Sequence, residues 1–257
     1  MDTNAIFFSD PSPTSTSTQP LAYLKPRDDY HPVPHSTSSI FYLAVTTPHT
    51  DTYMLHGPVR SFSALLPTIT ALASDSPSAL DKLENLSYSA PDVWGNRTTR
   101  ASFLTHGFRT LIVDGERGTY TVLQVLTEEN AGVKDVLPAP VYTVTRHGPL
   151  VYAYDGLGAK ARLGAARGVA ASSELVGCFA ERKEAVSAAR KAMDGMVEGE
   201  RKVNRIENLG KHGEDGGMLL ALGNGVRWEV RVKYDSEVLK IARESAEKEG
   251  AGLAWRF

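Results

Sequence analysis

The stretch LVGCFAERKEAVSAARKAM, residues 175–193, has a counterpart in LHGPVRSFSALLPTITALA, residues 55–73. The two stretches align without a gap, so that Gly57 corresponds to Gly177. Apolar residues then follow at the spacing of one helix face. They are Leu65, Leu66, Ile69, Leu72 and Ala73 in the first stretch, and Ala185, Val186, Ala189, Ala192 and Met193 in the second. A glycine turn that leads into a helix thus occurs twice, and the sequence predicts two copies of one unit.

Segments with the composition of β-strands flank both helices. Residues 40–47 and 52–55 precede the first helix, and residues 108–113 and 119–126 follow it as a predicted hairpin. Residues 141–145 and 150–154 precede the second helix, and residues 218–222 and 226–234 follow it around Asn224-Gly225, a dipeptide typical of tight hairpin turns. Each unit therefore has the order strand, strand, helix, strand, strand, which predicts an α+β fold with antiparallel sheets.

Three regions follow from this pattern. Residues 9–38 are rich in Ser, Thr and Pro and have too few apolar residues to offset the entropy of ordering, so residues 1–38 are predicted to be a disordered arm. Residues 39–137 form the first α+β repeat. Residues 138–257 form the second repeat, which ends in a C-terminal helix that begins at Ser236.

Composition excludes several classes of protein. The chain has 257 residues, of which 42% are apolar and 23% charged, as in ordinary globular proteins. Its net charge of −2 gives no general attraction to nucleic acid or to anionic membranes. A single cysteine, Cys178, excludes a disulfide within the chain, and no apolar run approaches the roughly 20 residues that span a bilayer. The start of the chain lacks the features of a secretory signal, so we expect a cytoplasmic or nuclear protein without a membrane partner.

The sequence contains none of the motifs that identify a phosphate-binding loop, a zinc protease, a serine hydrolase or a paired CxxC site. We therefore expect no cofactor and no metal, and the sequence leaves open whether the chain is an enzyme. Histidine precedes glycine at His56, His106, His147 and His212. His106, His147, Asp114 and Arg146 are candidate catalytic residues, because Asp114 and Arg146 lie near the two histidines in the chain. The competing interpretation is a turn residue before a glycine with positive φ.

Cys178 is a further catalytic candidate, because it follows Gly177 close to a predicted helix start, where a thiol pKa can be lowered. A nucleophile would also need a base, which the sequence does not specify. The competing interpretation is a small core residue.

Residues 156–172, GLGAKARLGAARGVAAS, are present only in the second copy. Glycines and the three basic residues Lys160, Arg162 and Arg167 make this segment a candidate loop for binding an anion or a nucleotide. The competing interpretation is a surface insertion of small residues. We expect the fold to form without this segment.

Three functions remain. The first is a non-catalytic interaction or regulatory protein with a protein partner, which an exposed apolar patch would favour. The second is an enzyme or small-ligand binding protein whose pocket, between the two repeats, takes a small anionic ligand. The third, binding of nucleic acid through Lys160, Arg162 and Arg167, has the least support, since aromatic residues are not interleaved with the basic ones.

Overall fold

The computed structural model describes residues 25–87, 100–151, 168–209, 216–223 and 225–234. Residues 88–99, most of the insertion with Lys160, Arg162 and Arg167, and the predicted C-terminal helix lie outside the described residues.

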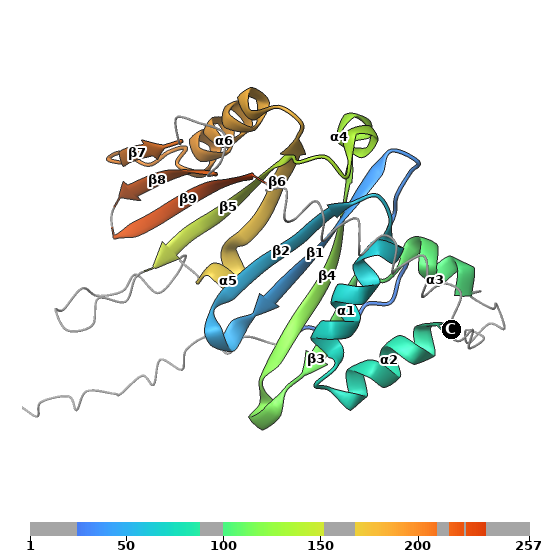
Figure 1. The fold of residues 1–257 in the computed structure, drawn as a ribbon. Helices are drawn as coiled ribbons and strands as arrows, with labels where there is room; N and C mark the ends of the chain where they lie inside the picture. The colour runs from blue at the N-terminus through green and yellow to red at the C-terminus, as the bar shows by residue number, and fades with distance from the viewer. Residues whose placement is uncertain (1–24, 88–99, 152–167, 210–215, 224, 235–257) are drawn as a thin grey trace, which may run out of the picture.

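Two antiparallel sheets confirm the predicted α+β class (Figure 1). The first has the order β2-β1-β4-β3, and the second has the order β6-β5-β9-β8-β7. The strands are β1 (Ser39–Thr47), β2 (Thr52–Val59), β3 (Thr110–Asp114), β4 (Tyr120–Glu129), β5 (Tyr142–Val151), β6 (Ser173–Phe179), β7 (Asn204–Asn208), β8 (Gly217–Gly223) and β9 (Val226–Tyr234). The helices are α1 (Leu66–Ala73), α2 (Pro77–Ser87), α3 (Arg100–His106), α4 (Ala131–Val136), α5 (Val169–Ser172) and α6 (Arg182–Met196), with short 3-10 turns at Pro48–Thr50, Phe62–Leu65 and Glu116–Gly118.

The sheets and helices form four layers (Figure 1). Helices α1, α2 and α3 cover the outer face of the first sheet, around Phe41, Leu43 and other alternate residues of its strands. Helix α6 covers the outer face of the second sheet, where Trp228, Val230 and Val232 are buried as alternation predicts. The inner faces meet in a third apolar cluster, which we call the seam and which contains Ile40, Tyr42, Val133, Leu137, Val141 and Cys178.

The two halves share several features. Strands β6-β5-β9-β8 repeat the order β2-β1-β4-β3, and β7 is added at one edge. The aligned helix positions are buried in both halves, at Leu65, Ile69 and Ala73 and at Ala185, Ala189 and Met193. Leu66 and Val186 are both half-buried. These features support the duplication, which stays a prediction, as do the proposed domain boundaries.

The strands before each helix differ from the prediction. Strand β2 does not end at Leu55 but runs through Gly57-Pro58, where the pairing with β1 shifts register. Gly57 has φ +108°, and a Cβ there would lie 2.7 Å from the carbonyl oxygen of Phe41, so the bulge requires glycine. In the second half, the turn predicted at residues 146–149 is absent, because β5 is one continuous strand, Tyr142–Val151, that pairs with β6.

Two polar segments also carry regular structure that their composition does not predict. The polar stretch before residue 140 contains the end of β4 and helix α4, whose first turn is capped by the Asn130 side chain accepting from Val133 N–H at 3.0 Å. The polar stretch after α6 contains strand β7, which the sequence analysis did not predict.

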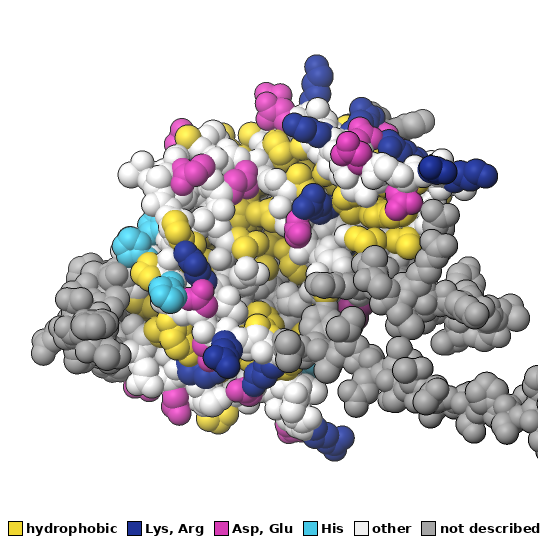
Figure 2. Space-filling model, turned by 180° about the vertical axis from the view of Figure 1, so that it is seen from behind, with side chains coloured by type: hydrophobic (Ala, Val, Ile, Leu, Met, Phe, Trp, Pro, Cys, Tyr) yellow, Lys and Arg dark blue, Asp and Glu magenta, His cyan; other side chains and the backbone are white. Residues whose placement is uncertain are grey.

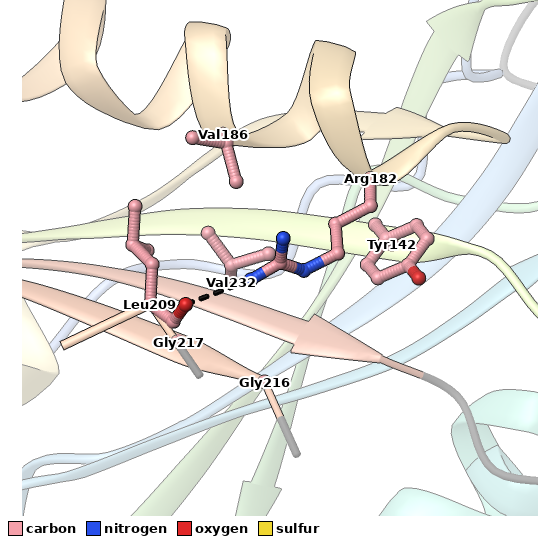
Figure 3. A pocket seen from close by; sticks show the side chains of 7 residues that line it. All are labelled: Tyr142, Arg182, Val186, Leu209, Gly216, Gly217 and Val232. Carbon is pink, nitrogen blue, oxygen red and sulfur yellow. Dashed lines mark hydrogen bonds between the residues drawn. The ribbon is translucent and has the colours of Figure 1, made fainter. Parts of the chain in front are cut away.

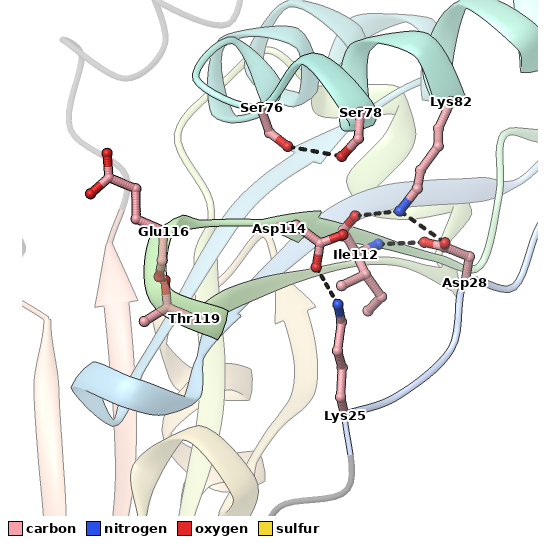
Figure 4. A network of polar contacts seen from close by, with 9 residues as sticks. All are labelled: Lys25, Asp28, Ser76, Ser78, Lys82, Ile112, Asp114, Glu116 and Thr119. Atoms are coloured by element: carbon pink, nitrogen blue, oxygen red, sulfur yellow. Dashed lines mark hydrogen bonds and ion pairs between the residues drawn. The ribbon is translucent and has the colours of Figure 1, made fainter.

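Residues 25–38, assigned to the arm, lie against the first sheet. Asp29 pairs with Thr110 at the outer edge of β3, and Val33 is buried in the core beneath the helices. The carboxylate of Asp28 accepts a hydrogen bond from Ile112 N–H at 2.7 Å and lies 3.0 Å from the ammonium of Lys82 (Figure 4). Residues 25–38 cover β3, an edge strand whose backbone would otherwise be unpaired. This contact explains why the segment lies against the sheet despite its polar composition.

We predict that Asp28→Ala lowers the free energy of unfolding by about 1–3 kcal/mol, because it leaves the partly buried Ile112 N–H without its acceptor. Urea unfolding measures this change. Asp75→Ala, at an exposed position after α1, is the matched control and should change stability by less than about 0.5 kcal/mol. Equal effects of the two substitutions would contradict the structural role of residues 25–38.

Candidate functional site

The five candidate catalytic residues lie in separate surroundings. His106 ends α3, and its ring centroid is 4.8 Å from that of His35. Asp114 forms an ion pair with Lys25 at the end of β3 (Figure 4). Arg146 donates from Nε to Glu174 at 2.9 Å on the surface of the second sheet. His147 and Cys178 lie on β5 and β6, each with its own partners. A catalytic role for these residues stays a prediction that gains no support from this arrangement.

His147 is almost fully buried, with 3% of its surface exposed. Its Nδ1 lies 2.6 Å from the hydroxyl of Ser173, and its Nε2 lies 3.0 Å from the hydroxyl of Thr145. The Ser173 hydroxyl in turn donates to the carbonyl of Val169 in α5. Burial, aided by the positive charge of Arg231, lowers the pKa of His147 to about 4. The imidazole is therefore neutral at pH 7, and it joins β5, β6 and α5 as a structural link.

Glu229 lies opposite His147 in the pairing of β5 with β9 and has no exposed surface. Alternation along β9 places its side chain on the face opposite to Trp228 and Val230, and that face is covered at this position. Its carboxylate accepts from Arg231 Nη2 at 2.7 Å and pairs with Arg227 on the other side. Two guanidinium groups thus offset the cost of burying this charge.

Cys178 is also fully buried, and its sulfur lies 3.9 Å from the hydroxyl of Thr143. Its backbone N–H donates to the carboxylate of Glu128 at 3.1 Å, and its carbonyl accepts from the amide of Asn130 at 2.8 Å. These bonds tie β6 to the end of β4. They fit the interpretation of Cys178 as a small core residue.

An open apolar surface lies on β7 and β8, on the face turned away from α6. Met218, Leu220 and Leu222 alternate with residues that pack beneath α6, and Ile206 lies directly opposite Leu220. Ile206 is 54% exposed, Leu222 40% and Met218 37%. We call these four residues the β7–β8 patch. It was missed because NRIEN, residues 204–208, has one apolar residue in five and no strand signal of its own.

The backbone of β7 is open as well. Among the described strands, β7 pairs only with β8 and forms the outer edge of the second sheet. Its charged side chains are held on the α6 side, where Glu207 pairs with Arg190 and Arg205 pairs with Asp194. The charges that often protect an edge strand thus turn away from the patch.

Three hollows in the described part of the structure are each lined by one half of the chain. The hollow between α6 and the second sheet has a volume of about 10 Å³, room for one water molecule, and Arg182 closes it by donating to the Leu209 carbonyl at 2.7 Å (Figure 3). A second, of about 490 Å³, is an open depression along α6 beside Lys183. The third is a groove of about 640 Å³ on the first half, lined by His35, Arg60, Lys134 and their neighbours.

The described residues include no group of three or more His, Cys, Asp or Glu side chains placed to hold a metal ion. In the same ranges, no helix combines the length and apolar character needed to cross a membrane. Comparison with protein-family models, curated proteins and solved structures finds no match for this sequence. Function is therefore argued from the surface of this chain.

The pKa of His147 predicts how stability depends on pH. Because folding lowers this pKa from 6.5 to about 4, the unfolded chain binds the proton more readily. The histidine therefore contributes stability above pH 6.5, and up to about 3 kcal/mol of it is lost as the pH falls from 6.5 to 4. His147→Gln should flatten the unfolding free energy over this range relative to the parent chain. His49→Gln, at an exposed position, is the control for the loss of one histidine side chain, and parallel curves for His147→Gln and the parent would contradict the prediction.

Proposed function

We propose that this chain is a non-catalytic interaction protein of the cytoplasm or nucleus that binds an extended segment of a partner protein at the edge of β7. The observation that carries this proposal is the β7–β8 patch beside an unpaired strand edge. A strand added at such an edge gains main-chain hydrogen bonds, and its alternate side chains meet the adjoining face of the sheet. Hydrophobic side chains also reach the surface among charged groups on the rear face of the molecule (Figure 2).

The charges beside the patch indicate what the partner segment contains. Arg227 lies opposite Leu222 and Arg231 lies opposite Met218, so a guanidinium adjoins each end of the patch. Both pair with the carboxylate of Glu229, so two guanidinium groups lie beside the patch. A segment with alternating apolar residues and acidic residues at its ends matches this surface in both shape and charge.

The alternative is an enzyme or small-ligand binding protein with its pocket between the two halves. It draws no support from the three hollows described above, since each is lined by residues of one half. Binding of nucleic acid through Lys160, Arg162 and Arg167 rests on the sequence alone, because these residues lie outside the described ranges.

Selection of displayed random peptides against the full chain tests the proposal. We expect the selected peptides to alternate apolar residues and to carry acidic ones. Ile206→Lys should weaken their binding at least about tenfold, because it places a charge in the centre of the patch. Leu80→Lys, at an exposed leucine of α2, is the matched control and should not change binding.

Backbone hydrogen exchange gives a second readout, since β7 amides should become protected when a selected peptide binds. Peptides that bind the parent and Ile206→Lys equally, or that protect another edge, would refute strand addition at β7. Selection of no peptide at all would also count against it.

A further inference from the structure

The groove on the first half forms a site that is independent of the β7–β8 patch. It lies between the residues that precede β1, the turn after β2, the end of α3 and helix α4. Its volume of about 640 Å³ is in the range of small-molecule sites. Its lining residues are His35, Ser36, Thr37, Phe41, Arg60, Ser61, Ser63, Leu104, Thr105 and Lys134. Two are cationic, five carry hydroxyl groups, and none carries a carboxylate.

Arg60 holds one wall of the groove in place. Its Nε donates to the carbonyl of Lys134 at 3.0 Å, and its Nη2 donates to the carbonyls of Asp135 and Leu137. The guanidinium therefore satisfies the end of α4 and fixes the backbone of Lys134 beside the groove. Among the described residues, the ammonium of Lys134 forms no ion pair, so its charge remains for a ligand.

The hydroxyl groups add donors at defined places. Ser61 and Ser63 lie 2.9 Å apart, so one hydroxyl donates to the other and one hydrogen of the pair remains for a ligand. Ser36 donates to the carboxylate of Glu129, which also accepts from Ser38 and Ser39. These three bonds hold the pKa of Glu129 at about 2, so this carboxylate stays ionised, and the Ser36 hydrogen is not available to a ligand.

His35 and the groove floor supply an aromatic and apolar surface. The His35 Nδ1 lies 2.9 Å from the Val33 carbonyl, which can only accept, so Nδ1 carries a hydrogen. The His35 ring packs edge-on against Phe41, with centroids 5.1 Å apart. His35 and Leu104, which are both half-buried, therefore offer an apolar surface next to the cationic wall.

We propose that this groove binds a phosphate monoester with a small apolar or aromatic body. A phosphate has three oxygens that point in different directions, so it can accept from Lys134, from the Ser61–Ser63 pair and from Thr37 together. A planar carboxylate satisfies fewer of these donors. The apolar body packs on the His35 ring and on Leu104.

Calorimetric titration of the full chain with phenyl phosphate tests this site, with inorganic phosphate, benzoate and phenol as comparison ligands. Phenyl phosphate should bind more tightly than each of the other three. Lys134→Met should weaken it by about tenfold or more, because a charge-assisted hydrogen bond is lost. Lys183→Met is the matched control, since Lys183 lines the basic depression on α6, and it should not alter binding.

Thr105→Glu provides a second variant, because Thr105 is exposed and a carboxylate there repels an anion within the groove. It should abolish binding while the melting temperature stays within a few degrees of the parent. The site is refuted if phenyl phosphate does not bind, or if both groove variants bind it as the parent does. Binding of benzoate or inorganic phosphate as tight as that of phenyl phosphate would refute the ligand class.

Discussion

The two sheets are joined through the carboxylate of Glu128, and the rest of the structure depends on this contact. Glu128 accepts from the Tyr42 hydroxyl at 2.7 Å, from the Asn130 amide at 2.9 Å and from the backbone of Cys178 at 3.1 Å. These donors belong to β1, to the start of α4 and to β6, so one acidic group bonds elements of both sheets. Burial raises the pKa of Tyr42, which keeps its hydroxyl a donor. Without Glu128, the Tyr42 hydroxyl and the Cys178 N–H would lose this acceptor within an apolar seam, and the Asn130 amide would keep only its bond to the Cys178 carbonyl.

The position of this junction explains which surfaces remain open. The seam contains residues of β1 and β6 and of the segment before β5, so the four-stranded sheet packs on that side of the five-stranded sheet. Strands β8 and β7 extend beyond the four-stranded sheet, as Figure 1 shows. The apolar side chains of β8 that face away from α6 are therefore left without a covering layer. The hydrogen bond between His147 and Ser173 lies between the seam and strands β8 and β7.

The features that could be predicted from the sequence are those determined locally. The buried stripe of α6 follows from 3.6-residue periodicity, and the hairpin of β8 and β9 follows from alternation around an Asn-Gly turn. Strand β7 could not be found in this way, because it exists through pairing with β8 and ion pairs to α6. The same holds for Asp28, whose role appears only when β3 is recognised as an edge. The candidate histidines were chosen by their neighbours in the chain, whereas His147 is in fact bonded to Ser173, 26 residues away.

Strand β7 is weakly attached, so its pairing with β8 is coupled to the binding of any molecule at its edge. It is five residues long, all of them exposed, and it is held by one ladder of backbone bonds and by surface ion pairs. Ion pairs of this kind contribute little and weaken with salt, so β7 belongs to the least stable part of the second sheet. A molecule that adds a strand at this edge binds β7 when it is paired with β8 and does not bind it when that pairing is broken. By mass action, the concentration of that molecule then determines the fraction of time for which β7 is paired with β8.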